Sequence, residues 1–210
     1  MEIQKGKFLS ELKTKMKNDK SLPLRSNATN LVFGEGNPET EVMFIGEGPG
    51  YWEDQKGIPF VGNAGAFLNQ LIVTAGLTRE EVFITNVVHH RPPENRDPEP
   101  SEVAAYQPYL DEMIKIIEPE IIVTLGRFSM GKFLPNARIS SVHGKKFDVN
   151  WKGRELVIVP MYHPAAGLRA TGVKEQTIED FKKLSEILKE VNDNESEKSN
   201  ESTGEQMQLV

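Results

Sequence analysis

Residues 42–50 read VMFIGEGPG, a short apolar run that ends in a glycine-rich turn. A nearly continuous run of this length, rich in β-branched and aromatic residues, is typical of a strand that is covered on both faces. Similar runs occupy 82–88, 121–125 and 156–161. The pattern predicts four buried strands, each followed by a polar loop.

Helical patterns, with apolar residues three or four positions apart, separate and follow these runs. They cover 64–75, 102–117, 127–134 and 174–191. Strands that alternate with helices favour parallel neighbours joined by crossover connections. We therefore expect an α/β protein, a three-layer α/β/α sandwich with a central, mostly parallel four-stranded sheet, formed by one domain over residues 1–191.

The remaining residues, 192–210, differ in composition. From Glu190 to the end, six acidic residues and one lysine account for −5 of the net charge of −6. Residues 192–204 contain almost no apolar side chain, so burial cannot offset their ordering entropy. We predict a disordered acidic tail, and a nearly neutral domain that has room for a local basic groove.

The composition also excludes some classes of protein. The chain has no cysteine, so disulfides, thiolate metal sites and cysteine nucleophiles are absent. No apolar run approaches the roughly 18 residues that span a bilayer. We expect a cytoplasmic monomer with no membrane partner.

The predicted strand ends bring distinct chemical groups to one edge of the sheet. Glu47 supplies a carboxylate, Asn86 a carboxamide and His163 an imidazole, while Phe60 supplies an aromatic face. Taken singly, each has an ordinary alternative: a tight turn, a turn cap, a structural histidine and a core phenylalanine. Together they are the groups needed to hold a planar base and break a nucleoside bond.

The order of motifs resembles the family-4 uracil-DNA glycosylases of bacteria and archaea over about residues 22–188. The motifs are LVFGEGNP at 31–38, GEGPG at 46–50, GIPFVGNAG at 57–65, TNVV at 85–88, RPPENRDP at 91–98, LGR at 125–127, HGK at 143–145 and HPAAGLR at 163–169. The resemblance implies a DNA-repair enzyme that flips uracil out of DNA and hydrolyses its N-glycosidic bond. It also implies association with the nucleoid.

The resemblance implies a role for each matching position. Glu47 would orient water or stabilise positive charge on the sugar, Asn86 would bind the uracil edge, and His163 would hydrogen-bond O2. Phe60 would stack on the base, and Glu53 would help to exclude thymine. The backbone at Gly46 and Gly48 would approach the uracil. The implied DNA contacts are Arg91, Arg96, Lys145, Ala165, Leu168 and Arg169, with Leu168 as a wedge.

One feature departs from this family, whose members usually hold a four-iron four-sulfur cluster. The four expected cysteine positions carry Asp19, Leu22, His90 and Tyr106. Because leucine cannot bind iron and the other three match a cluster poorly, we expect no cofactor and no metal. Packing and hydrogen bonds among these side chains would replace the cluster.

The last five residues, Gln206–Val210, resemble the short peptide by which bacterial repair proteins dock on the sliding clamp, a candidate partner besides uracil-containing DNA. Two alternatives to a glycosylase stay open. Loss of the cluster could accompany loss of chemistry and leave a catalytically weak uracil-binding or DNA-binding accessory protein of the replication or repair machinery. The same sheet could also serve a small-molecule nucleotide hydrolase.

Overall fold

The computed structural model describes the backbone of residues 2–207 and the side chains of residues 4–191 and 193. Its six-stranded sheet has the order β1-β3-β2-β4-β6-β5. The strands are β1 (Glu35–Gly36), β2 (Val42–Gly46), β3 (Phe83–Asn86), β4 (Ile121–Leu125), β5 (Phe147–Trp151) and β6 (Arg154–Met161). The four central strands are mutually parallel, and both edge strands are antiparallel to their neighbours.

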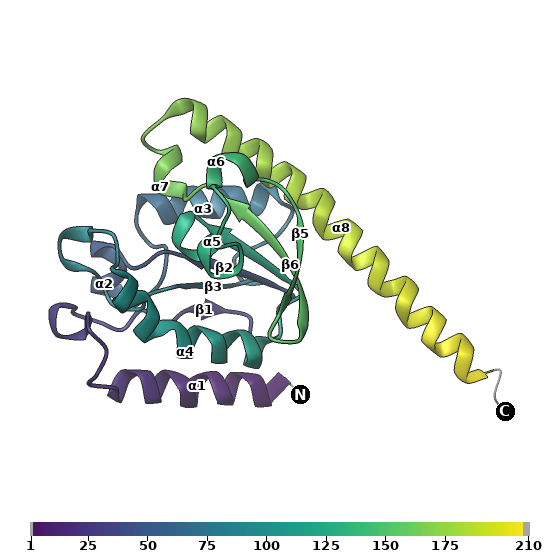
Figure 1. The fold of residues 1–210 in the computed structure, drawn as a ribbon, viewed down its shortest axis with the longest axis horizontal. Helices are drawn as coiled ribbons and strands as arrows, with labels where there is room; N and C mark the ends of the chain where they lie inside the picture. The colour runs from purple at the N-terminus through teal and green to yellow at the C-terminus, as the bar shows by residue number, and fades with distance from the viewer. Residues whose placement is uncertain (1, 208–210) are drawn as a thin grey trace.

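Helices cover both faces of this sheet (Figure 1). They are α1 (Glu2–Asn18), α2 (Tyr51–Lys56), α3 (Asn63–Thr74), α4 (Pro100–Ile117), α5 (Arg127–Phe133), α6 (Ile139–Val142), α7 (Pro164–Gly167) and α8 (Thr171–Met207). Two short 3₁₀ turns, Arg25–Asn27 and Pro93–Asn95, lie in the loops. The predicted three-layer α/β fold is confirmed, as are its four strands and four helices.

The two faces of the sheet have separate apolar cores. Helices α1 and α4 pack on one face, where Met16 and Met113 meet Met43 and Ile45 of β2. Helices α3 and α8 pack on the other face, where side chains such as Phe181 meet Phe44. Alternate residues of β2 thus enter opposite cores, which is why the strand reads as a continuous apolar run.

The predicted strand count of four was too low. Strand β1 has only two residues, too few to give a sequence signal. Strand β5 alternates half-buried and exposed residues, as expected at an edge, so it lacks the continuous apolar run that marks the central strands. Helix α1 was not predicted either, because lysines interrupt the stripe of Leu9, Leu12 and Met16 that it buries.

The backbone of helix α8 continues to Met207, through most of the segment for which the composition predicts a disordered tail (Figure 1). Val191, the residue at which the predicted domain ends, is the last buried residue among the side chains that the structure describes. The boundary at 191 and the disorder beyond it stay predictions. Within the described chain, no helix combines the length and the apolar content needed to cross a membrane.

Candidate active site

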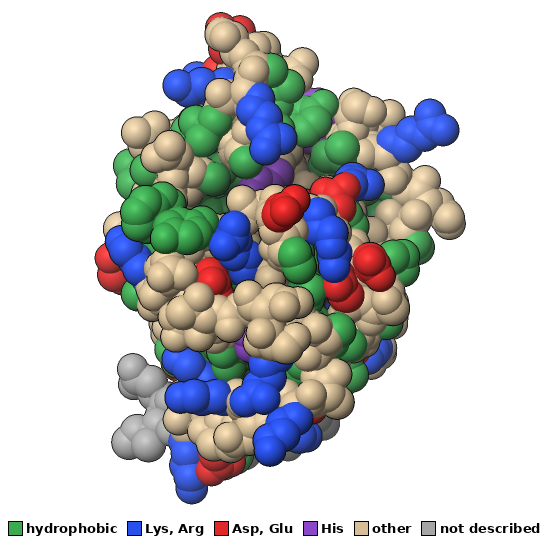
Figure 2. All heavy atoms as spheres, turned by 90° about the vertical axis from the view of Figure 1, so that its left-hand side faces the viewer, with side chains coloured by type: hydrophobic (Ala, Val, Ile, Leu, Met, Phe, Trp, Pro, Cys, Tyr) green, Lys and Arg blue, Asp and Glu red, His purple; other side chains and the backbone are tan. Residues whose placement is uncertain are grey.

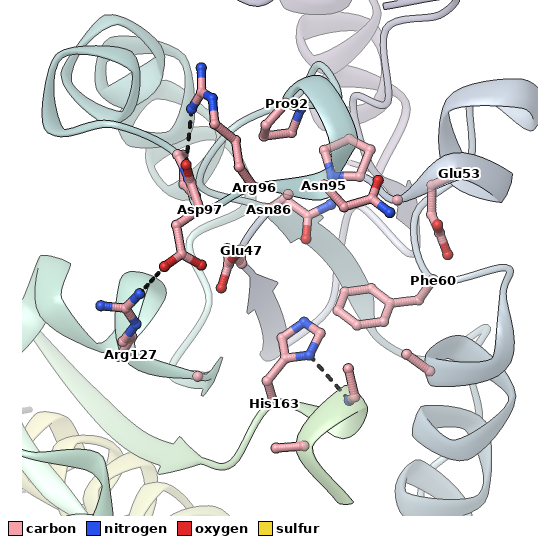
Figure 3. A pocket seen from close by; sticks show the side chains of 18 of the residues that line it. Glu47, Glu53, Phe60, Asn86, Pro92, Asn95, Arg96, Asp97, Arg127 and His163 are labelled. Carbon is pink, nitrogen blue, oxygen red and sulfur yellow. Dashed lines mark hydrogen bonds and ion pairs between the residues drawn. The ribbon is translucent and has the colours of Figure 1, made fainter. Parts of the chain in front are cut away.

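A cavity of about 510 Å³ opens at the carboxyl ends of the parallel strands. Glu47 follows β2, Asn86 ends β3 and His163 follows β6, and all three side chains line this cavity together with Phe60 (Figure 3). The sequence predicts that these four side chains meet, and the structure brings them together. The lining of the cavity also includes Gly48, Glu53, Arg96, Ala165 and Arg169.

Asn86 presents a polar group that the protein leaves unused. The residue is 1% exposed, and its Oδ1 has no hydrogen-bond partner among the described residues. A buried polar atom without a partner is costly, so such atoms in a cavity mark a place for a ligand. Gly46 gives Asn86 its room, since a Cβ at this position would lie 2.4 Å from Oδ1 and 2.6 Å from Phe60 Cζ.

Phe60 is held in the cavity wall by its backbone. Its φ of 52° lies in the left-handed region, which is rare for a bulky residue. Gly65 permits this turn, since a Cβ there would lie 1.8 Å from the Phe60 carbonyl oxygen. The Phe60 ring lies 5.7 Å from that of His163, tilted by 31°. These two rings form adjacent walls of the cavity (Figure 3).

Glu53 fixes the loop that carries Phe60. Its Oε1 accepts hydrogen bonds of 2.9 Å from the backbone N–H groups of both Val61 and Gly62. The carboxylate thus satisfies donors at the start of α3. Glu53 lines the cavity as expected, and the structure adds this positioning role.

His163 is held as a neutral imidazole. As the N-cap of α7, its Nδ1 accepts a hydrogen bond from the Ala165 N–H at 3.2 Å. This bond assigns the ring proton to Nε2, the nitrogen that faces the centre of the cavity in Figure 3. Burial, assisted by the positive charge of Arg169, lowers the pKa of His163 to about 4. At neutral pH the ring is therefore an uncharged hydrogen-bond donor.

Charged groups of both signs lie near Glu47. Burial raises the pKa of its carboxyl, and the nearby Asp97 adds to this effect. Arg127 and Arg169 oppose it. Asp97 forms an ion pair with Arg127, and its carbonyl accepts a hydrogen bond of 2.9 Å from Arg96 (Figure 3). Neither Asp97 nor Arg127 was predicted to belong to the site, although both lie within the motifs RPPENRDP and LGR.

Of the six residues predicted to contact DNA, Arg96, Ala165 and Arg169 line the cavity, and Leu168, Arg91 and Lys145 do not. Leu168 at the end of α7 is 48% exposed, as a wedge requires. The Arg96 guanidinium already pairs with Glu102. Lys145 donates to the Ser141 carbonyl, and Arg91 donates to Asn95.

Of the four positions at which the resemblance places cluster cysteines, two contact each other and the other two have partners elsewhere. His90 Nδ1 lies 2.8 Å from the Tyr106 hydroxyl, and both side chains are buried. Asp19 accepts a hydrogen bond of 2.6 Å from Tyr109, while Leu22 packs in the core. Hydrogen bonds from Ser21 and Tyr109 lower the pKa of Asp19 to about 2. This donor set does not fit an iron-sulfur cluster.

The candidate clamp peptide, Gln206–Val210, lies outside the residues whose side chains are described. Its role stays a prediction.

Comparison with known proteins supplies an independent view of the chain. Residues 33–189 match the family model described as the uracil DNA glycosylase superfamily. The chain is 47% identical over 185 residues to the type-4 uracil-DNA glycosylase of Sulfurisphaera tokodaii. The aligned region covers 85% of this chain and 84% of that relative. Type-4 uracil-DNA glycosylases of Archaeoglobus fulgidus and Thermotoga maritima are 44% and 41% identical, covering 78% and 80% of this chain and 85% and 88% of their own.

Proposed function

We propose that the strand-end cavity binds a uracil extruded from DNA. The basis is that this chain belongs to the uracil-DNA glycosylase superfamily, among its type-4 enzymes. The protein is a uracil-DNA glycosylase, a DNA-repair hydrolase that cuts the bond between uracil and deoxyribose. The observation that best supports this use of the cavity is the unpartnered Oδ1 of the buried Asn86.

Uracil offers the partner that Asn86 lacks. The Asn86 Oδ1 would accept a hydrogen bond from uracil N3–H, and its amide would donate to O4. Cytosine carries no proton on N3 and presents an amino group in place of O4, so it would leave this carboxamide mismatched. The Phe60 ring would stack on the base. Glu53, through the loop it holds, would help to close the cavity against the methyl group of thymine.

Cleavage separates charge, and the cavity has groups suited to both signs. As the bond from C1′ to N1 breaks, its electron pair moves to the uracil, and the neutral His163 would donate from Nε2 to the O2 that gains negative charge. The Glu47 carboxylate would stabilise the positive sugar and orient a water. That water adds its oxygen to C1′ and releases a proton, and the uracil anion takes up a proton at N1, which leaves an abasic site and neutral uracil.

Extrusion of the base requires DNA contacts around the cavity. Leu168 would enter the gap in the stack, with Arg169 near a phosphate. Arg91, Arg96 and Lys145 would add further phosphate contacts. Because unpaired or mispaired uracil is cheapest to extrude, single strands and U·G pairs would both serve as substrates.

The function is tested with labelled DNA that contains a single uracil, incubated with the protein in chelator and then treated with alkali. We expect strand cleavage at the uracil position and none in the matched thymine DNA. Full activity in chelator would support our proposal that the enzyme uses no cluster or other metal. DNA binding without abasic sites would instead favour the accessory protein.

The C-terminal peptide is a candidate docking site for a protein partner of the enzyme. We propose that Gln206–Val210 docks on the sliding clamp and so raises the local concentration of the enzyme at replicating DNA. Deleting these five residues should abolish clamp binding and leave cleavage of free oligonucleotides unchanged. Unchanged clamp affinity would reject this assignment. The enzyme would act as a cytoplasmic, nucleoid-associated monomer, which sedimentation with and without DNA can test.

A further inference from the structure

Two large aromatic side chains stand exposed beside the cavity. Tyr51 and Trp52 begin α2, directly after Gly50 of the cavity lining, and they are 49% and 57% exposed. Their rings make an edge contact with centres 5.2 Å apart. Figure 2 views the side of the molecule that carries α2, where hydrophobic side chains lie next to Lys and Arg side chains.

This aromatic pair stands on a helix fixed by other residues. Glu53 is bonded to the loop of Phe60, as described above. Asp54, which is buried, accepts hydrogen bonds of 2.8 and 3.2 Å from the N–H groups of Thr29 and Asn30. The inward residues thus hold α2 in place, while the aromatic rings remain available to a partner.

A cation accompanies the pair. The Arg91 guanidinium lies 5.3 Å from the centre of the Tyr51 ring and donates a 2.7 Å hydrogen bond to Asn95. Both of these partners are uncharged, and none of the ion pairs found within the described chain includes Arg91. Exposed aromatic rings joined to a positive charge are the features that bind single-stranded nucleic acid.

We propose that Tyr51 and Trp52 form a stacking platform for the base next to the extruded uracil in single-stranded DNA, with Arg91 on the intervening phosphate. This inference rests on the proposed function, because the adjacent cavity is what places a nucleotide here. In a duplex, the neighbouring base is stacked within the helix and paired, so it gains little from the platform. The platform therefore favours single-stranded substrate.

Kinetics with two substrates test this preference. For Trp52→Ala and Tyr51→Ala we expect KM on single-stranded uracil DNA to rise about tenfold with kcat unchanged, since base stacking is lost. The KM for a U·G duplex should change much less. Phe8→Ala is the matched control, an aromatic residue that is 42% exposed on α1. Equal KM changes on both substrates, or none, would overturn the proposal.

A second measurement does not depend on catalysis. The chain has two tryptophans, so Trp151→Phe leaves Trp52 as the sole tryptophan. Titration with uracil-free single-stranded DNA should quench its fluorescence, and Tyr51→Ala in this background should weaken the binding. Absence of quenching overturns the platform even if the enzyme cleaves uracil DNA. Quenching by a protein that forms no abasic sites would reject the proposed function and keep the platform.

Discussion

The strand-end cavity and the region of the four cluster positions use similar side chains in opposite ways. In the cavity, Asn86 Oδ1 is buried without a partner, and His163 is oriented by a single backbone bond. At the cluster positions, His90 is bonded to Tyr106, and Asp19 to Tyr109. Polar groups that meet each other stabilise a fold, whereas a group of the cavity lining that is left without a partner is ready for a ligand. The two regions should therefore respond differently to substitution.

The largest effect is expected in the cavity. Replacing His163 or Asn86 with alanine should lower kcat about 10²- to 10³-fold, the range found when one donor to a developing negative charge is removed. Thermal stability should change far less than the rate, because Asn86 Oδ1 bonds nothing in the described protein and His163→Ala removes one helix cap, a loss of about 1 kcal/mol. Single-turnover cleavage and thermal melting measure the two quantities. Parental rates in both variants would show that the site lies elsewhere.

A somewhat smaller effect is expected at Glu47. Glu47→Gln should lower kcat about 10²-fold, because it removes the negative charge while keeping the shape. The raised pKa of Glu47 also predicts that parental activity falls as the pH drops through it, since the carboxylate is the active form. A rate profile against pH checks this limb. An identical acid limb in Glu47→Gln would mean that another group titrates.

The converse pattern is expected at the cluster positions. Tyr106→Phe leaves the buried His90 Nδ1 without its partner and should cost about 1–3 kcal/mol of unfolding free energy, with kcat unchanged. Urea unfolding measures this loss. Tyr109→Phe is a milder comparison, since its partner Asp19 lies near the surface. If Tyr106→Phe abolished cleavage without lowering stability, the contrast between the regions would fail.

The smallest effect concerns pH. Burial lowers the pKa of His90 from 6.5 to about 4. Between these two pH values the unfolded chain binds a proton at this residue and the folded chain does not. Stability from this group is complete above pH 6.5 and is lost as the pH falls toward 4. His90→Asn should reduce the slope of the unfolding free energy against pH by about 1 kcal/mol per pH unit. Urea unfolding at several pH values detects it, and an unchanged slope would contradict a neutral His90.

Much of the fold could be predicted because the central strands enter two cores and therefore read as continuous apolar runs. Parallel strands end at a common edge, so Glu47, Asn86 and His163 could be grouped before any coordinates were known. The edge strands and α1 could not, since half-buried elements give weak patterns. The bonds of Glu53 and the pair formed by Asp97 and Arg127 also escaped prediction, because loop conformation sets them.

The hydrogen bond from the Ala165 N–H to His163 Nδ1 ties the imidazole to the turn that ends at Leu168. If Leu168 enters the DNA stack as proposed, a force on it would reach the His163 ring through one short helical turn. The proposed wedge and the proposed hydrogen-bond donor to uracil would then be mechanically coupled. Lengthening this turn by one residue should uncouple them, even though every side chain of the pocket remained.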